Sequence, residues 1–366
     1  MANRGDTLMP TARRPGGVNS EFAFELQVCA WAERHWPPEG SDDRPVVVAR
    51  QLGTGRRRWD TIVLVCDPEG LAARGAFGER RLDSDLLHVV RHAPPEWAWY
   101  REALPDPGYP WRYVRESVHR AADRGLVDRR KRDGRVQIRR VRPYPDWVER
   151  VVAVENKPDL DASAARALQP QIRHDVAVGL ADEVWVATTE AGDRVEPALL
   201  EDIPVEAGIL TVAPGTRGAD AARVVWRPRT LAVDEPGTRI LENPASGSES
   251  HDASAARFEY ADPDWKGRKR LEIAERAYER GWRSYADSMR PDCRHFDLDP
   301  GPAVARPYCT AKDCHQTAGE CAGSCPEFEP EPPAWRQRGW PVDGGPGAGV
   351  KRLLTRQRSR RRPDDE

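Results

Sequence analysis

Apolar residues occur in short runs along this chain, and the two longest runs carry acidic side chains. Residues 59–65 read Trp-Asp-Thr-Ile-Val-Leu-Val, and residues 151–157 read Val-Val-Ala-Val-Glu-Asn-Lys. Valine, isoleucine and aromatic residues are enriched in strands, so both runs are predicted to form buried strands. Shorter apolar runs predict further strands at 46–49, 184–187, 209–212 and 224–226.

Apolar residues with helical spacing accompany these strands. One helix is predicted to begin after Asn19 or Ser20, either of which can cap it, and to end near His35. A second helix is predicted from about Ala162 to Val178. Strands and helices in this order predict an α/β core.

The residues between the two long strands, 81–145, have a pattern of their own. Three helices are predicted, over 83–92, Glu96–Leu104 and Trp111–Arg124, and a hairpin follows with Asp133-Gly134 at its turn. Three helices followed by a hairpin resemble a winged helix-turn-helix domain. The resemblance implies that this insertion contacts DNA.

Charge favours DNA contact by the insertion. From Trp111 to Arg142 the chain has twelve Lys or Arg and four Asp or Glu, a net charge of +8. The third helix would present basic residues opposite an apolar face, as a recognition helix does, and the hairpin tip suits phosphate contacts. The predicted DNA-binding residues are Arg112, Arg115, His119, Arg129, Arg130, Lys131, Arg132 and Arg135. The alternative is an exposed, arginine-rich unit that only braces the core.

Glu155 and Lys157 are two residues apart on a predicted strand, so their side chains point to the same side of it. A lone Glu-x-Lys at a strand end is typical of a surface ion pair. Asp60, near the start of the other long apolar run, favours a different interpretation. Two carboxylates can hold Mg²⁺, which activates a bound water, and a lysine can orient that water and stabilise developing charge.

An Asp on one strand and Glu-x-Lys on another resemble the PD-(D/E)XK, or restriction-endonuclease-like, nuclease superfamily, although Trp59 stands where that family often has proline. The resemblance implies a mixed sheet flanked by helices, and Mg²⁺ or Mn²⁺ bound by the two acids. The catalytic residues that it implies are Asp60, Glu155, Lys157, a glutamate of the first helix at Glu21 or Glu25, and Gln171 on the later helix.

Five of the seven cysteines cluster after a predicted helix, which runs from about Arg268 to Met289. Without an export signal, a reducing compartment and metal binding are favoured over disulfides. The spacing C-x15-C-x4-C-x6-C-x3-C differs from a standard zinc ribbon and is loosely similar to the iron–sulfur cysteines of some RecB-like nucleases. We predict a Zn²⁺ or iron–sulfur site formed by Cys293, Cys309, Cys321 and Cys325, with Cys314 as the alternative ligand.

The overall composition of the chain restricts its possible partners and location only slightly. The formal net charge of −2 indicates no partner, and no apolar run is long enough to span a membrane. The first seventeen residues lack the apolar core of a signal peptide, so a cytoplasmic protein is expected. The order of segments along the whole chain is also similar to an uncharacterised protein family from haloarchaea, which implies no particular activity.

Two functions are consistent with these patterns. The first is a divalent-metal-dependent DNA nuclease, and the intact acids and lysine favour it. The alternative is a non-catalytic DNA-binding or regulatory protein on a nuclease-like fold. The predicted segments are a flexible tail (1–17), a core in two parts (18–80 and 146–235), the insertion (81–145), a flexible linker (236–263), a helix with the cysteine-rich region (264–345) and a basic tail (346–366).

Overall fold

The computed structural model describes most of the chain between residues 21 and 330. The described residues are 21–38, 44–189, 201–213, 216, 218–242, 257–287, 289–290, 292–299, 306–316, 321 and 324–330. Some predictions fall outside them, namely the tails at 1–17 and 346–366, the capping residues Asn19 and Ser20, and the last part of the cysteine-rich region, 331–345.

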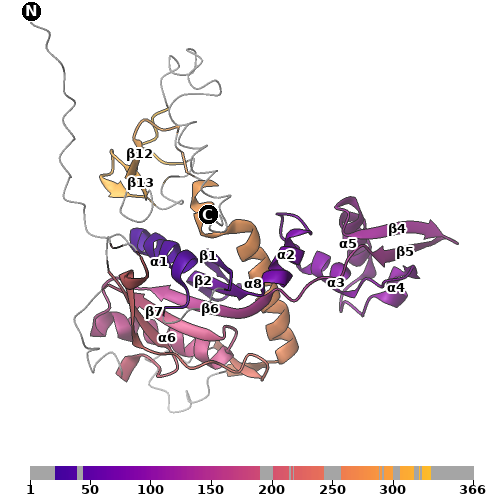
Figure 1. The fold of residues 1–366 in the computed structure, drawn as a ribbon, viewed down its shortest axis with the longest axis horizontal. Coiled ribbons are helices and arrows are strands. Elements are labelled where there is room, and N and C mark those ends of the chain that lie inside the picture. The colour runs from indigo at the N-terminus through magenta and orange to yellow at the C-terminus, as the bar shows by residue number, and fades with distance from the viewer. Residues whose placement is uncertain are drawn as a thin grey trace, which may run out of the picture.

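A six-stranded mixed sheet forms the core (Figure 1). Its strands, in spatial order, are β1 (Val46–Gly53), β2 (Arg58–Cys66), β6 (Val148–Asn156), β7 (Glu183–Thr188), β8 (Gly208–Val212) and β9 (Ala222–Trp226). β1, β2 and β6 pair antiparallel, β7 and β8 continue parallel to β6, and β9 is antiparallel at the far edge. Each of the six apolar runs therefore forms a strand, as predicted.

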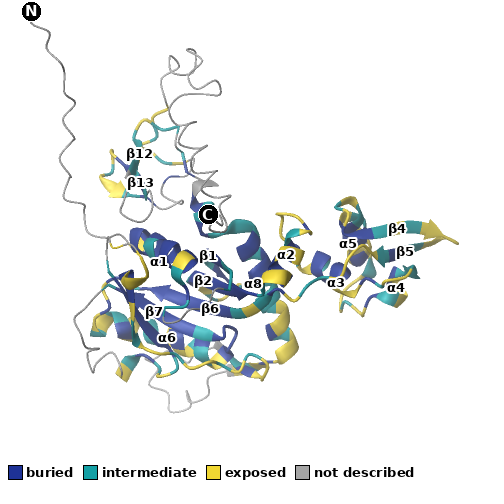
Figure 2. Ribbon diagram, in the orientation of Figure 1, coloured by how far each residue is buried: buried dark blue, intermediate teal, exposed yellow. Residues whose placement is uncertain are grey.

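Helices cover both faces of the sheet, which confirms the predicted α/β architecture. On one face, α1 (Glu21–His35) and the short helix η2 (Trp282–Asp287) pack against β1, β2 and β6. On the other face, α8 (Pro263–Arg280) covers these same strands and α6 (Ala162–Val178) covers β7. The long apolar runs are buried on both sides as a result, and the central strands are dark in Figure 2.

After β2, α2 (Pro68–Gly75) leads into a lobe that projects from the core (Figure 1). The lobe contains α3 (Ser84–His92), β3 (Ala98–Trp99), α4 (Tyr100–Ala103), α5 (Trp111–Asp123), β4 (Val127–Arg132) and β5 (Arg135–Arg140). Its helices and its β3-β5-β4 sheet enclose a separate apolar cluster around Val114, Val118 and Ile138. At the hairpin turn Asp133 and Gly134 both have positive φ, as a type I′ turn requires.

The predicted helix Glu96–Leu104 is only partly formed. Ala98 and Trp99 instead pair with Ile138 and Gln137 of β5, so the helix shortens to Tyr100–Ala103. Pairing with the hairpin supplies the backbone hydrogen bonds that this segment would otherwise make within a helix. The local helical pattern is therefore overridden by a strand contact from forty residues away.

The predicted linker at 236–263 is not a simple linker. β10 (Gly237–Glu242) and β11 (Arg257–Ala261) pair antiparallel, with the residues between them outside the described part. Polar composition concealed this pair, because a two-stranded ladder is held by backbone groups rather than by apolar side chains. The helix that follows, α8, begins earlier than predicted, since Asp262 caps it by accepting a hydrogen bond from Trp265 N–H. It also ends earlier, at Arg280, because Gly281 follows with a positive φ.

A small antiparallel sheet follows η2. It consists of β12 (Phe296–Asp299), β13 (Arg306–Cys309) and β14 (Cys314–His315), and Phe296 and Leu298 pack against the apolar cluster of α1. A single 3-10 turn, η1 (Ala219–Ala221), precedes β9. No helix among the described residues is both long enough and apolar enough to cross a bilayer.

Candidate functional site

The register of the central sheet brings the two predicted acids together. Thr61 of β2 pairs with Val154 of β6, so the next positions along this antiparallel ladder are Asp60 and Glu155. The backbone N–H of Asn156, the residue after Glu155, donates a hydrogen bond to Asp60 Oδ2 at 3.0 Å, which joins the two strand ends. Glu155 is also the partner of Val186 on β7, which packs beneath α6. Glu155 therefore lies on the α6 face, and Asp60 lies close enough to it for its charge to raise the pKa of Glu155.

Asp60 is held in place by two hydrogen bonds. Its Oδ2 accepts one from the backbone N–H of Asn156 at 3.0 Å, and its Oδ1 accepts one from Nε2 of Gln51 at 3.0 Å. Gln51 donates also to Glu25 of α1 at 3.0 Å, and its φ of 54° is uncommon for a residue other than glycine. Gln51 on β1 thus connects the first acid to the first helix.

Glu155 is buried, with 6% of its surface exposed, and Arg57 pairs with it. Arg57 Nη2 donates to Glu155 Oε1 at 2.5 Å and to Asp175 Oδ2 at 2.8 Å, which joins β6 to α6. Burial and the neighbouring Asp60 carboxylate nevertheless raise the pKa of Glu155 to about 8. A buried acid whose pKa is raised by a second acid is a frequent feature of functional sites.

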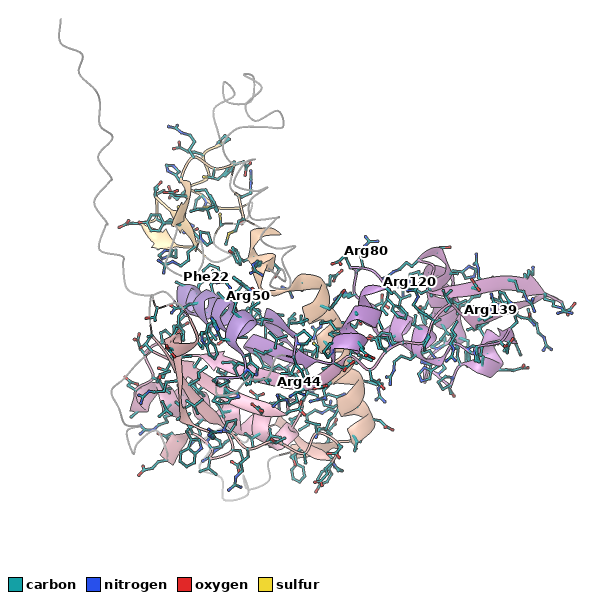
Figure 3. All side chains as sticks on the ribbon, in the orientation of Figure 1. Phe22, Arg44, Arg50, Arg80, Arg120 and Arg139 are labelled. Carbon is teal, nitrogen blue, oxygen red and sulfur yellow. The ribbon has the colours of Figure 1, made fainter. Side chains whose placement is uncertain are left out.

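Glu25 is the helical glutamate that lies nearest these acids. Its carboxylate accepts two hydrogen bonds from Arg50, at 2.9 and 2.7 Å. The Arg50 guanidinium lies 4.9 Å from the ring centre of Phe22, and both residues are labelled in Figure 3. Burial raises the pKa of Glu25, and the Asp60 carboxylate adds to the increase. Glu25 and Asp60 are therefore close enough to interact electrostatically.

Lys157, the third predicted catalytic residue, lies just beyond the end of β6. Its backbone N–H donates to the carbonyl of Ala187, which fixes the main chain there, and its Nζ pairs with Glu21 Oε1 at 2.5 Å. The Glu21 side chain is 67% exposed, so this ion pair is solvated and weak. The ammonium can leave Glu21 for a bound anion at little cost.

Gln171 does not join the site. The side of α6 that faces the sheet carries Ile172 and Asp175, and Gln171 is exposed on another side of the helix. Within the described residues Gln171 makes no hydrogen bond to the acids. Asp175, one turn later, is the α6 residue that reaches them through Arg57. The predicted contribution of α6 is thus corrected from Gln171 to Asp175.

Four residues of the site belong to none of the sequence motifs described above. They are Arg50, Gln51, Arg57 and Asp175. Arg57 precedes Asp60 by three residues, so its proximity to the first acid could have been suspected. The contact of Arg57 with Glu155 depends on how β2 pairs with β6, which no local pattern encodes.

The acid cluster has donors suited to a divalent metal. Asp60 and Glu155 offer hard oxygen ligands, and Mg²⁺ commonly binds through one or two carboxylates while keeping several waters. The mutual repulsion of the two acids, evident in the raised pKa of Glu155, is relieved by a cation between them. In the described part of the chain, no three His, Cys, Asp or Glu side chains converge into a ready-formed metal site. The two-carboxylate set fits Mg²⁺ or Mn²⁺ without a third.

The lobe exposes most of the basic residues predicted to contact DNA. Arg112 and Arg115 are exposed on α5, whereas His119 is half-buried beside the apolar face. On the hairpin, the Arg130 and Arg135 guanidinium groups lie 4.3 and 4.7 Å from the ring centres of Trp97 and Trp99. Arg129, Lys131 and Arg132 are exposed near the tip. The predicted basic surface therefore exists, and two aromatic rings stiffen part of it.

The four cysteines chosen from the sequence line one small cavity. Cys293, Cys309, Cys321 and Cys325 surround a space of about 20 Å³ below the β12-β13-β14 sheet. Cys314 is exposed and lies outside this lining. All seven cysteines are free thiols, and Cys29 and Cys66 are buried in the core.

Stability without added divalent metal should depend on pH through Glu155. Its pKa is raised from 4.5 to about 8, so the folded chain keeps a proton that the unfolded chain releases at lower pH. The stabilisation that this proton gives to the folded state is complete below about pH 4.5. It declines as pH rises and is lost above about pH 8. Glu155→Gln should flatten the decline in urea-unfolding free energy between pH 5 and pH 8.

The matched control for this measurement is Glu149→Gln, since Glu149 is a more exposed glutamate on the same strand. The control should keep the pH slope of the unaltered chain. Equal slopes for Glu155→Gln and the unaltered chain would contradict the assigned burial effect.

Comparison with known proteins assigns the chain to a family but indicates no activity. No curated protein and no solved structure matches the chain significantly. A family model matches residues 47–330, a span that contains Asp60, Glu155, Lys157, the projecting lobe and the four cavity cysteines. The chain belongs to a protein family of unknown function, DUF5787.

Proposed function

We propose that this protein is a DNA nuclease that depends on Mg²⁺ or Mn²⁺. The observation that carries the proposal is the proximity of Asp60 of β2 and Glu155 of β6 on adjacent strands. Asp60 accepts a hydrogen bond from the Asn156 N–H and raises the pKa of Glu155, and Lys157 follows Glu155 by two residues. The order α1-β1-β2-β6-α6-β7 supports it, because a helix, an antiparallel three-strand unit, a helix and a parallel strand are the order of a restriction-endonuclease-like core. The lobe between β2 and β6 is then an insertion in that core.

In the proposed reaction, water adds to phosphorus and one P–O ester bond of the DNA backbone breaks. Asp60 and Glu155 would hold the metal, which supplies charge neutralisation and a more acidic bound water. Lys157 donates a hydrogen bond that orients the attacking water and places a positive charge beside the phosphate. Gln51 and the Asn156 N–H hold Asp60 in position.

Arg57 has a positioning role in this proposal. It bridges Glu155 and Asp175, and its side chain is only 13% exposed. The pKa of Arg57 is raised, because the Asp175 and Glu155 carboxylates outweigh the opposing effect of burial. Arg57 therefore stays charged and limits the repulsion between Glu155 and Asp60.

The projecting lobe is the proposed DNA-docking unit, with the architecture of a winged helix. Its α5 is amphipathic, with Val114 and Val118 buried and Arg112 and Arg115 exposed. An exposed basic helix beside a basic hairpin suits a duplex, since the helix can enter the major groove while the hairpin contacts phosphates.

The proposal is tested by incubating the full chain with end-labelled single-stranded and duplex DNA, with Mg²⁺, with Mn²⁺ and with chelator. Cleavage should require one of the two metals. Binding of DNA without cleavage under every metal condition would contradict the nuclease assignment.

Docking by α5 gives a second prediction. The double variant Arg112→Glu/Arg115→Glu should weaken DNA binding by more than about tenfold at low salt, because two phosphate contacts become repulsive. It should also reduce the slope of log K against log salt by about 2, which a salt titration by fluorescence anisotropy measures.

The control is Arg34→Glu/Arg227→Glu, which makes the same charge change at exposed positions on α1 and just after β9. This control should retain the binding constant and salt slope of the unaltered chain more closely. Equal losses in the two double variants would indicate a general charge effect, not docking by α5.

One observation favours the second candidate, a non-catalytic DNA-binding protein on the same fold. Arg57 and Arg50 pair with the Glu155 and Glu25 carboxylates, and such pairs can stabilise an acid cluster that no longer binds metal. The metal-dependent cleavage assay separates the two candidates, because only the nuclease turns over DNA.

A further inference from the structure

Four of the seven cysteines line one cavity, although they come from separate positions in the sequence. Cys293 precedes β12, and its backbone forms an isolated antiparallel β-bridge with Pro330. Cys309 ends β13, opposite Phe296 of β12. Cys321 and Cys325 come from the segment after β14 and complete the lining. The small sheet thus gathers thiols that are up to 32 residues apart.

The surroundings of these thiols suit a bound cation more than free cysteine. Cys309 and Cys321 are each only 9% exposed. Both line the same cavity as Cys293 and Cys325. The Arg290 backbone N–H donates to Cys321 Sγ at 3.4 Å, an interaction that favours the thiolate.

We propose that Cys293, Cys309, Cys321 and Cys325 bind one zinc ion. The lining supplies four sulfur ligands from one small sheet and the segments on either side of it. Four thiolates in tetrahedral coordination are the usual ligands of structural zinc. On binding, each thiol loses one proton to solvent and its sulfur coordinates the ion.

The sulfurs must turn inward to close the site, because the described His, Cys, Asp and Glu side chains form no finished metal cluster as they stand. Side-chain rotation can supply this movement, since all four lie on the lining of the same cavity. Bound zinc would then stabilise the folded form of the β12-β13-β14 region, because so small a sheet has little apolar core of its own. Cys321 also belongs to the apolar cluster beneath α1, so the ion would tie this region to the core.

The inference is independent of DNA cleavage and is tested on the full chain, purified without chelator. Native mass spectrometry and elemental analysis should find about one zinc per chain. Cys309→Ser and Cys321→Ser should lose it. Cys314→Ser is the matched control and should keep it, because Cys314 lies outside the cavity lining.

A labelling experiment on the unaltered chain avoids variants that fail to fold. Alkylation of the folded protein should modify Cys314 at once and should spare the four cavity cysteines until a zinc chelator is added. Iron with sulfide and a brown colour, absence of any bound metal, or zinc retained in both cavity variants would each overturn the inference. So would rapid alkylation of the four cysteines before chelation.

Discussion

Replacing Asp60 by Asn should lower metal-dependent DNA cleavage by more than about a hundredfold, the scale on which loss of one charge-stabilising group reduces turnover. Asparagine keeps the size of the side chain but removes one of the two neighbouring carboxylates, Asp60 and Glu155. Glu155→Gln should have a similar effect for the same reason. Initial cleavage rates on labelled DNA at saturating metal measure both.

Three measurements make this result interpretable. Glu149→Gln on the same strand should leave cleavage unchanged, because Glu149 pairs with Arg44 away from the acids. Circular dichroism should show that each variant is folded, and DNA affinity should persist, since docking is assigned to the lobe. Full cleavage by Asp60→Asn would refute the assigned role of the acids.

The largest stability loss is expected when Glu275 of α8 is replaced by Ala, by about 3–5 kcal/mol. Its carboxylate accepts hydrogen bonds from Arg74 Nε and Nη2, each at 2.6 Å, from Leu82 N–H at 2.7 Å and from the Tyr144 hydroxyl at 2.6 Å. The Arg74 and Glu275 side chains are 0% and 1% exposed. Removal of Glu275 therefore leaves a buried guanidinium without its counter-charge.

The double variant Arg74→Met/Glu275→Leu should recover part of this loss, because no unpaired charge then remains in the interior. Glu272→Ala is the control on the same helix. Its pairing with Lys269 is partly exposed, so the loss should be about 1 kcal/mol or less. Denaturant unfolding of all three variants measures these differences, and a loss below about 1 kcal/mol for Glu275→Ala would contradict the expectation.

The Arg74–Glu275 pair connects the projecting lobe to the core. Arg74 lies on α2 and Leu82 at the entrance of the projecting lobe, whereas Glu275 lies on α8 after the last strand of the core. One carboxylate thus joins the base of the lobe to the core.

Most local structure of this chain is determined by its sequence. Short β-branched runs specify their strands wherever both faces of a sheet are buried, and this holds for the central strands β2, β6, β7 and β8. Asp161 and Asp262 mark the starts of α6 and α8 as caps, and Asp133-Gly134 marks the hairpin. The convergence of Asp60 and Glu155 was predictable too, since both stand on long buried runs.

Tertiary structure alone decided the neighbours of these residues. Arg57 meets Glu155 and Asp175 only because β2 pairs with β6 and α6 crosses their face, and the turn of α6 selects Asp175 over Gln171. Strand pairing likewise shortened one helix of the lobe and turned the ends of a polar segment into β10 and β11. Such contacts join residues far apart in sequence, so their energies depend on the assembled fold and leave no local pattern to read.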